Sequence, residues 1–236
     1  MLTITRFIST WLLLLLIPYN GLAIESIHTD SIHINNNLKG QSELATLFNN
    51  LALQYEEKGD YVQALPLYQQ SLSISKQILG NNHPKVAMTL SNLASIYQQQ
   101  EDYQKALPLY KQSLAIYQKV FNKEHVSIAI TLNNLAELYR VTGDYKKSAP
   151  LYQQSLSIYE KLLGKDHPTI AISLNNLALL YEAQGISNKA NPLYQRAIAI
   201  LEKSFPNGHP NIDQIKQNYQ TALTKQNSFA LLTFSF

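Results

Sequence analysis

Apolar residues along this chain recur at the spacing of amphipathic helices that are separated by short polar breaks. In 128–141 they are spaced i, i+4, i+7, i+8 and i+11, which places them on one helical face: Ile128, Leu132, Leu135, Ala136 and Tyr139. Gly143 and Asp144 interrupt the pattern, and Asp144 is placed to cap a second helix over about 145–163. The pattern therefore predicts two helices joined by a turn.

This helix pair recurs at a constant step of 42 residues. The segment NNLALQY at 49–55 returns as related segments at 91–97, 133–139 and 175–181. Two further blocks, ALPLY and GNNHP, recur in the same register. Such self-similarity is the signature of a repeat protein. It predicts four helical hairpins, which span about 44–85, 86–127, 128–169 and 170–210.

A single hairpin cannot bury both faces of its helices, so neighbouring hairpins must stack and share one core. We therefore predict an all-α fold, an α-solenoid in which four hairpins form a right-handed superhelix and the first helices line its concave face. A capping helix over 211–225 is predicted from one apolar stripe on a polar segment: Ile212, Ile215, Tyr219 and Leu223. The array spans 43–226, after a polar lead-in at 24–42 and before an apolar tail at 227–236.

The first unit resembles the tetratricopeptide motif through Phe48, Leu51, Ala52, Tyr55, Ala64 and Tyr68. The 42-residue period, with N-N-L-A-x-x-Y, A-x-P-L-Y and G-x-x-H-P, is similar to the kinesin light chain-like subfamily of tetratricopeptide repeat (TPR) proteins. The resemblance implies that the Asn before the motif Leu contacts a bound peptide. Two departures are Ser148 in place of Ala, and Ile186-Ser187 in place of Asp-Tyr. The second departure predicts that the fourth hairpin is the weakest.

A helical wheel identifies the residues of the first helices that point away from the core. Stacking places that side on the predicted concave groove, which is lined by Asn50, Asn92, Asn134, Asn176, Met88, Ile130, Ile172, Leu53, Glu137 and Leu179. Asn is unfavourable inside a helix, so four copies require a reason. Each amide can donate to and accept from the backbone of an extended peptide. Alternatively, the amides bond to neighbouring helices or cap loops.

The charged residues of the predicted groove limit the class of peptide that we expect it to bind. The predicted groove carries four acids against Arg140 and no lysine: Glu56, Glu57, Glu137 and Glu182. Peptide carboxylates are captured by paired Lys and Arg, so a carboxylate clamp is not expected. We predict a non-catalytic scaffold or adaptor whose partner is a protein or an extended peptide, neutral to mildly basic.

Other chemistry finds little support in the sequence. The chain has no cysteine and a net charge of +3 without a basic block, so thiolate metal sites and nucleic acid are not expected. One histidine recurs in each unit, but stacking separates the copies too far for one metal ion: His83, His125, His167 and His209. No nucleotide-binding or hydrolase motif occurs, so we expect no enzyme activity and no cofactor.

The first 23 residues have the pattern of a secretory signal. Arg6 precedes an apolar run over 7–17, and small residues follow Pro18 at 21–23. The run is shorter than the ~20 residues of a membrane-spanning helix. We predict an exported protein, periplasmic or extracellular, with a membrane anchor only if this segment is not cleaved. Two alternatives for function stay open: the TPR portion of a larger exported protein with a peptidase-like domain, or a self-associating structural solenoid.

Overall fold

The computed structural model describes residues 21–233, and within this range every element is an α-helix. The chain divides into two compact units, Met1–Leu44 and Ala45–Phe236. Most of the predicted signal, and residues 234–236 of the apolar tail, lie outside the described residues. Between residues 21 and 233 no helix has the length of apolar sequence that a bilayer crossing requires.

The described part of the first unit, 21–44, belongs to helix α2 (Gly21–Glu57), which continues into the second unit. The predicted polar lead-in at 24–42 is therefore helical. The segment contains no proline, and its only glycine, Gly40, lowers helix propensity by only about 1 kcal/mol. Polar composition alone gave no sign that the helix would begin so early.

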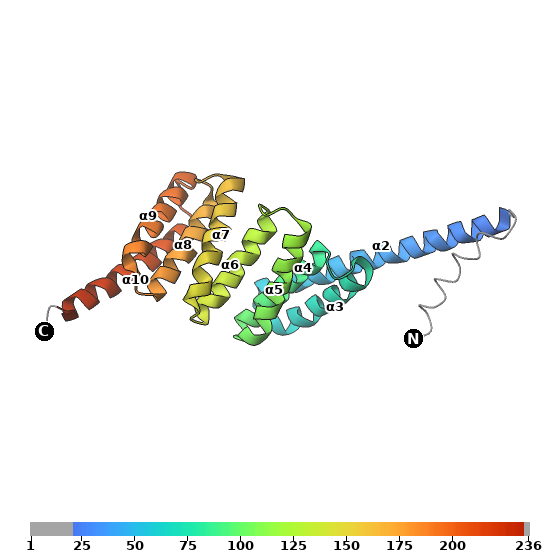
Figure 1. Cartoon of the computed structure of the whole chain (residues 1–236), viewed down its shortest axis with the longest axis horizontal. Helices are drawn as coiled ribbons and strands as arrows, with labels where there is room; N and C mark the ends of the chain where they lie inside the picture. Colours follow the sequence, from blue (N-terminus) through green and yellow to red (C-terminus); the bar gives the residue numbers. More distant parts are fainter. Residues whose placement is uncertain (1–20, 234–236) are drawn as a thin grey trace. The chain divides into compact units, whose positions relative to one another are not determined.

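The second unit is a stack of four hairpins and a closing helix (Figure 1). Hairpin 1 pairs residues 45–57 of α2 with α3, and the later hairpins pair α4 with α5, α6 with α7 and α8 with α9. Each second helix also packs against the first helix of the next hairpin. The prediction of an all-α solenoid is confirmed. The helices are α3 (Tyr61–Leu79), α4 (Pro84–Gln99), α5 (Tyr103–Val120), α6 (Val126–Val141), α7 (Tyr145–Leu163), α8 (Pro168–Ala183), α9 (Ser187–Ser204) and α10 (Pro210–Thr233).

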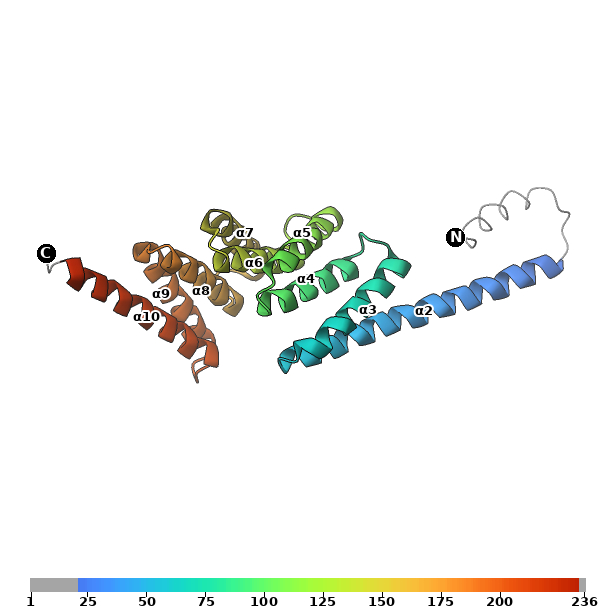
Figure 2. The same cartoon turned by 90° about the horizontal axis from the view of Figure 1, so that it is seen from below.

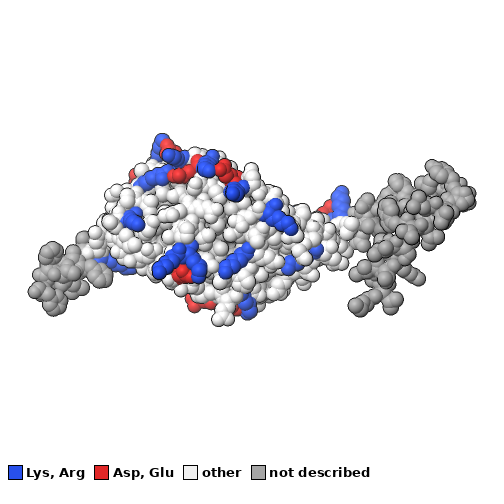
Figure 3. Space-filling model, in the orientation of Figure 1, with Lys and Arg blue, Asp and Glu red and all other residues white. Residues whose placement is uncertain are grey.

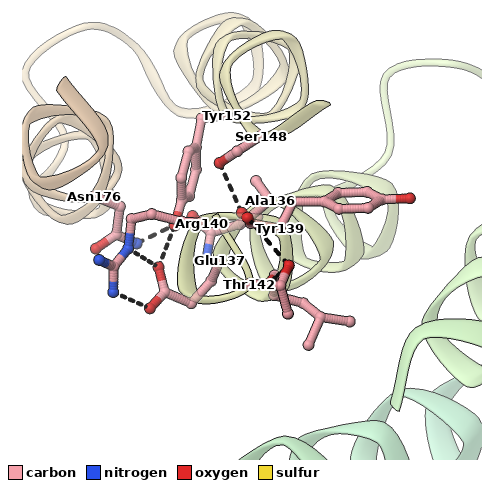
Figure 4. Close-up of polar contacts among 10 residues, drawn as sticks. Ala136, Glu137, Tyr139, Arg140, Thr142, Ser148, Tyr152 and Asn176 are labelled. Atoms are coloured by element: carbon pink, nitrogen blue, oxygen red, sulfur yellow. Dashed lines mark hydrogen bonds and ion pairs between the residues drawn. The ribbon is translucent and has the colours of Figure 1, made fainter. Parts of the chain in front are cut away.

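Small residues let the two helices of each hairpin approach closely near the turn. The motif alanine of the first helix is fully buried in all four hairpins: Ala52, Ala94, Ala136 and Ala178. The matching residue of the second helix is alanine in three hairpins and Ser148 in the third, and it is also fully buried. Ser148 donates a hydrogen bond of 2.7 Å to the Ala136 carbonyl (Figure 4). Serine is therefore accommodated at this position because it is small and its hydroxyl finds an acceptor.

Serine hydroxyls hold the first three hairpins together at the opposite end. Each donates a 2.7 Å hydrogen bond from the second helix to a backbone carbonyl of the first: Ser71 to Ala45, Ser113 to Ala87 and Ser155 to Ala129. All three serines are buried. In hairpin 4 the same position is Ala197, which has no hydroxyl to donate. Hairpin 4 thus lacks a contact that hairpins 1 to 3 share.

Tyrosines fill the space between the hairpins, as the sequence predicts. The largest fully buried side chains are four tyrosines one repeat apart: Tyr68, Tyr110, Tyr152 and Tyr194. Burial of a ring of this size contributes several kcal/mol of transfer free energy. These tyrosines therefore belong to the packed core.

Aspartates cap the second helices of the first three hairpins. Asp60, Asp102 and Asp144 each accept a hydrogen bond from the backbone N–H three residues later. In hairpin 4 the N-cap residue is Ile186, whose side chain makes no cap hydrogen bond. The prediction that hairpin 4 is the weakest rests on this missing cap and on Ala197.

The recurring histidines cap the first helices. The Nδ1 atom of each accepts a hydrogen bond of 3.1–3.2 Å from the backbone N–H two residues later: His83, His125, His167 and His209. Pro84 and Pro168 follow at the first helical position, where a missing N–H is harmless. Among the described residues, His, Asp and Glu form no group of three that could hold a metal ion.

Prolines lie within all four second helices, at Pro66, Pro108, Pro150 and Pro192, and each helix continues through its proline. The proline and the residue four positions earlier are exposed in every case. The carbonyl that loses its helical partner therefore belongs to a residue at the water-exposed surface. The lost bond is thus tolerated.

Helix α10 closes the stack and begins as the first helix of a fifth repeat would. Ile212 and Ile215 are buried against hairpin 4, which confirms the closing role. One repeat after Leu174 and Ala178, however, α10 carries Lys216 and Gln220, which are exposed. These residues make the next packing face polar, which opposes stacking of another hairpin or copy there. The helix extends to Thr233, beyond the predicted end at 225.

The cap role of the histidines predicts a difference between two variants of one residue. His167→Ala should lower the free energy of unfolding by about 1 kcal/mol, because the Thr169 N–H loses its acceptor. His167→Asn should stay close to the wild type, because Asn caps equally well. Urea unfolding followed by circular dichroism measures both, and equal losses would contradict the cap role.

The serine contact predicts a contrast within helix α7. Ser155→Val removes the bond to Ala129 and adds volume between closely packed helices, so unfolding should become easier by about 2 kcal/mol. The control Ser157→Val, two residues away and exposed, should change stability by less than about 0.5 kcal/mol. Thermal unfolding midpoints of the two variants test this, and similar midpoints would disprove a close contact at Ser155.

Candidate peptide-binding face

The ten residues predicted to line the groove lie on the first helices of the four hairpins. In Figure 2, α4 and α6 lie below α5 and α7, on the lower side of the middle of the stack. We call the surface formed by these ten residues the first-helix face. Its members are Asn50 and Leu53 on α2, Met88 and Asn92 on α4, Ile130, Asn134 and Glu137 on α6, and Ile172, Asn176 and Leu179 on α8.

Three apolar side chains one repeat apart are exposed on this face. Met88, Ile130 and Ile172 have exposed fractions of 40%, 45% and 44%. Their neighbours Ala87, Ala129 and Ala171 are completely buried. The two flanks of each first helix are covered by its partner helix and by the preceding hairpin, which leaves this strip open. Leu53 is also exposed, whereas Glu137 and Leu179 are half-buried.

The asparagines of the face are partly engaged in bonds between hairpins. Asn92 Nδ2 donates to Asn49 Oδ1 over 3.3 Å, and Asn176 Nδ2 donates to Asn133 Oδ1 over 3.1 Å. The alternative interpretation, amides that bond to a neighbouring helix, is therefore correct for these two residues. Each bond uses one N–H of the amide, and Asn has a second N–H and a carbonyl oxygen.

Asn134 and Asn50 differ from this pattern. Asn92 and Asn176 bond to an asparagine 43 residues earlier, and the residue 43 positions before Asn134 is Ser91. Within the described part of the chain, the Asn134 side chain makes no hydrogen bond. Asn50 belongs to the first hairpin and is exposed. These two amides have the most capacity left for a ligand.

Two residues near this face are not among those predicted from the sequence. Asn218 on α10 donates to Asn175 Oδ1 over 3.0 Å, which continues the asparagine bonds beyond hairpin 4. Its position, one repeat after Asn176, could have revealed it. Lys85 lines a cavity of about 60 Å³ together with Asn50 and Met88. The expectation of no lysine on this surface is therefore wrong at this end, because Lys85 lies one helical turn before Met88.

Glu137 is the centre of a polar cluster in hairpin 3 (Figure 4). Arg140 donates two hydrogen bonds to its carboxylate, of 2.7 and 2.6 Å, and the Tyr152 hydroxyl donates a third. Burial raises the pKa of the Glu137 carboxyl, but these hydrogen bonds outweigh burial and bring the pKa below its ordinary value. Asn176 of the next first helix lies beside this group. The guanidinium of Arg140 is thus already paired.

Hairpin 1 has a related cluster around Glu56. Its Oε2 atom accepts a 2.7 Å hydrogen bond from the Tyr68 hydroxyl, and Oε1 accepts one of 3.1 Å from Ser95 of the next first helix. Burial, with smaller contributions from Glu56, raises the pKa of Tyr68 far above its ordinary value. The hydroxyl therefore stays protonated and acts as a donor to Glu56.

The charged side chains of the described residues form no large patch of one sign on the side shown in Figure 3. Red and blue atoms lie together at some points, several blue groups stand alone, and large areas between them are uncharged. Several of these groups are exposed ion pairs, such as Lys161 with Glu124 and Lys203 with Asp166. Exposed pairs of this kind contribute little to stability.

Solved structures of other repeat proteins resemble this chain in fold. A solved structure of a putative kinesin light chain with nearly identical TPR-like repeats from Podosopora anserina is 28% identical, has a TM-score of 0.67, and the match covers 80% of this chain and 89% of that one. BtubC (BKLC) from P. vanneervenii is 27% identical with a TM-score of 0.63, and the match covers 71% of this chain. It covers 66% of the BtubC chain, slightly less than two thirds. No curated protein matches this chain significantly.

The repeat family itself is identified from the sequence. Residues 43–119 and 127–203 match the tetratricopeptide repeat family, which is more than half of the chain. These limits coincide with the stacked hairpins and with the blocks that recur every 42 residues. The chain therefore belongs to the tetratricopeptide repeat family.

Proposed function

We propose that this chain is a non-catalytic scaffold or adaptor that binds an extended segment of another protein along the first-helix face. TPR domains generally bind proteins or peptides, and the TPR fold of this chain is consistent with such a role. The arrangement of its side chains supports our proposal for which face binds and what chemistry the ligand has.

The observation that carries the proposal is the exposed strip of Met88, Ile130 and Ile172. Isolated exposed apolar residues are common, but three at one repeat position, each followed four residues later by Asn, form a regular surface. Packed helices lie about 8–10 Å apart, and an extended chain advances about 3.3 Å per residue. An extended peptide that crosses the first helices would thus meet one such position about every third residue.

The charges favour a neutral to mildly basic peptide. Arg140 is neutralised by Glu137, so this hairpin adds no net charge to the face. Glu56, Glu57 and Glu182 have no ion pair within the described residues, and Lys85 lies near one end. A peptide rich in carboxylates would find few cations along this face.

The place of action is proposed from the N-terminal sequence. Arg6, the apolar run over 7–17 and the small residues at 21–23 support export to a periplasmic or extracellular space. If the segment is not cleaved, it would act as an anchor, and the same binding face would then work at a membrane surface.

Asn134 is the residue whose replacement tests the binding face most cleanly. Asn134→Ala should weaken capture of peptides about five- to tenfold, because a lost hydrogen bond in a partly dry site contributes about 1–1.5 kcal/mol. Unfolding stability should change little, since the side chain bonds to no described residue. The measurement is binding of the purified full-length protein to a library of N-acetylated, C-amidated dodecapeptides.

Asn122→Ala serves as the control, because Asn122 is an exposed loop residue away from this face. It should bind the library as the wild type does. The proposal fails if the Asn134 variant captures the same peptides with unchanged affinity, or if the wild type captures none.

A further inference from the structure

Hairpins 1 and 4 carry the same four residues at the same repeat positions. Hairpin 1 has Asn50, Leu53, Glu56 and Tyr68, and hairpin 4 has Asn176, Leu179, Glu182 and Tyr194. Each residue of the second set follows its counterpart by three repeats. The two hairpins therefore offer an internal comparison in which these four residues are the same and the residues that the following helix presents to them differ.

In hairpin 1 the carboxylate is fully bonded. The Tyr68 hydroxyl donates to one oxygen of Glu56, and Ser95 of the following first helix donates to the other. Both oxygens of the acid thus have a protein donor, and the phenol beneath it has an acceptor.

In hairpin 4 the same pair is not bonded. Within the described residues, Glu182 Oε1 and the Tyr194 hydroxyl are buried without a hydrogen-bond partner. The residue three repeats after Ser95 is Thr221 on α10, but its hydroxyl donates to the Gln217 carbonyl of its own helix, at 2.9 Å. No neighbouring helix therefore supplies the second donor that Ser95 supplies in hairpin 1.

Glu182 and Tyr194 nevertheless interact electrostatically, and one is an acceptor and the other a donor. Burial, and then the Glu182 carboxylate, raise the pKa of the Tyr194 phenol, so the phenol remains a donor. Tyr194 is completely buried, whereas Glu182 is only half-buried and can be reached from the surface. Arg140, the cation that the preceding first helix adds to this surface, is held by Glu137. A buried polar atom without a partner costs free energy. Glu182 Oε1 is covered, so a donor from outside would meet the other oxygen, Oε2, and leave Oε1 for the Tyr194 hydroxyl.

We propose that Glu182 forms a subsite for the side chain of a lysine or arginine of the bound peptide. The ammonium or guanidinium donates to one carboxylate oxygen, as Ser95 does to Glu56. The Tyr194 hydroxyl donates to the other oxygen, as Tyr68 does in hairpin 1. Leu179, one turn earlier on α8, offers an apolar surface to the aliphatic stem of the basic residue. This subsite rests on the proposed function and gives the bound peptide a fixed position for its basic residue.

A matched pair of variants tests the subsite. Glu182→Gln and Glu56→Gln remove the same charge at the same repeat position, and both keep the shape of the side chain. Each full-length protein is presented with a dodecapeptide library in which lysine, arginine, glutamine or norleucine is fixed at one position at a time. The wild type should prefer lysine or arginine about tenfold over norleucine at one position.

The Glu182 variant should lose most of this preference, to about twofold or less, while it still binds peptides. The Glu56 variant should keep the preference, because Glu56 is already bonded within the protein. A preference that survives in the Glu182 variant, or is absent from a wild type that binds peptides, overturns the subsite alone. A wild type that binds no peptide overturns the proposed function with it.

A second measurement does not depend on the library. Tyr68→Phe should lower the unfolding midpoint of the free protein, because it leaves the Oε2 atom of Glu56 without a donor. Tyr194→Phe should leave the midpoint unchanged or raise it, since its hydroxyl has no partner to lose. Equal losses in the two variants would show that the Tyr194 hydroxyl already has an acceptor in the free protein, and would overturn the unsatisfied pair on which the subsite rests.

Discussion

The close approach of the two helices in each hairpin is the constraint on which the rest of the structure depends. Near the turn, alanine or serine occupies both sides of the crossing, as at Ala136 and Ser148. At the other end, Ser71, Ser113 and Ser155 bond to a backbone carbonyl of the first helix in hairpins 1 to 3. Because a larger side chain at either point would separate the helices, these contacts set the width of each unit. Equal widths allow the units to stack in register.

Regular stacking has a direct consequence for the open side of the first helices. Positions of the first helices that meet another helix are buried. The positions that stay exposed recur in successive hairpins and include Met88, Ile130 and Ile172. The asparagines beside it have two roles. Asn92 and Asn176 bond to the preceding hairpin, and the same amides keep groups that a ligand can use. The first-helix face is thus regular in geometry, while Glu137, Arg140 and Glu182 make each hairpin chemically different.

The sequence predicts the solenoid well because each repeat position meets the same surroundings in successive units. The motif alanines and the four core tyrosines are buried as expected. The bonds of the site were harder to predict, since they depend on which residue the next hairpin presents. Whether Glu56 is bonded depends on Ser95, and whether Glu182 is bonded depends on how Thr221 uses its hydroxyl. The helical lead-in was missed because a polar composition does not by itself prevent a helix from extending.

The most direct test of peptide binding along the first-helix face is to locate a bound peptide by NMR of labelled methyl groups. A dodecapeptide retained from the library would be added to protein labelled at the methyls of Met, Ile, Leu and Val. We expect the methyl signals of Met88, Ile130 and Ile172 to shift on binding, whereas those of Val120 and Leu162, which are exposed on second helices, should not. Shifts at Val120 and Leu162 with none at the first-helix methyls would contradict binding along this face.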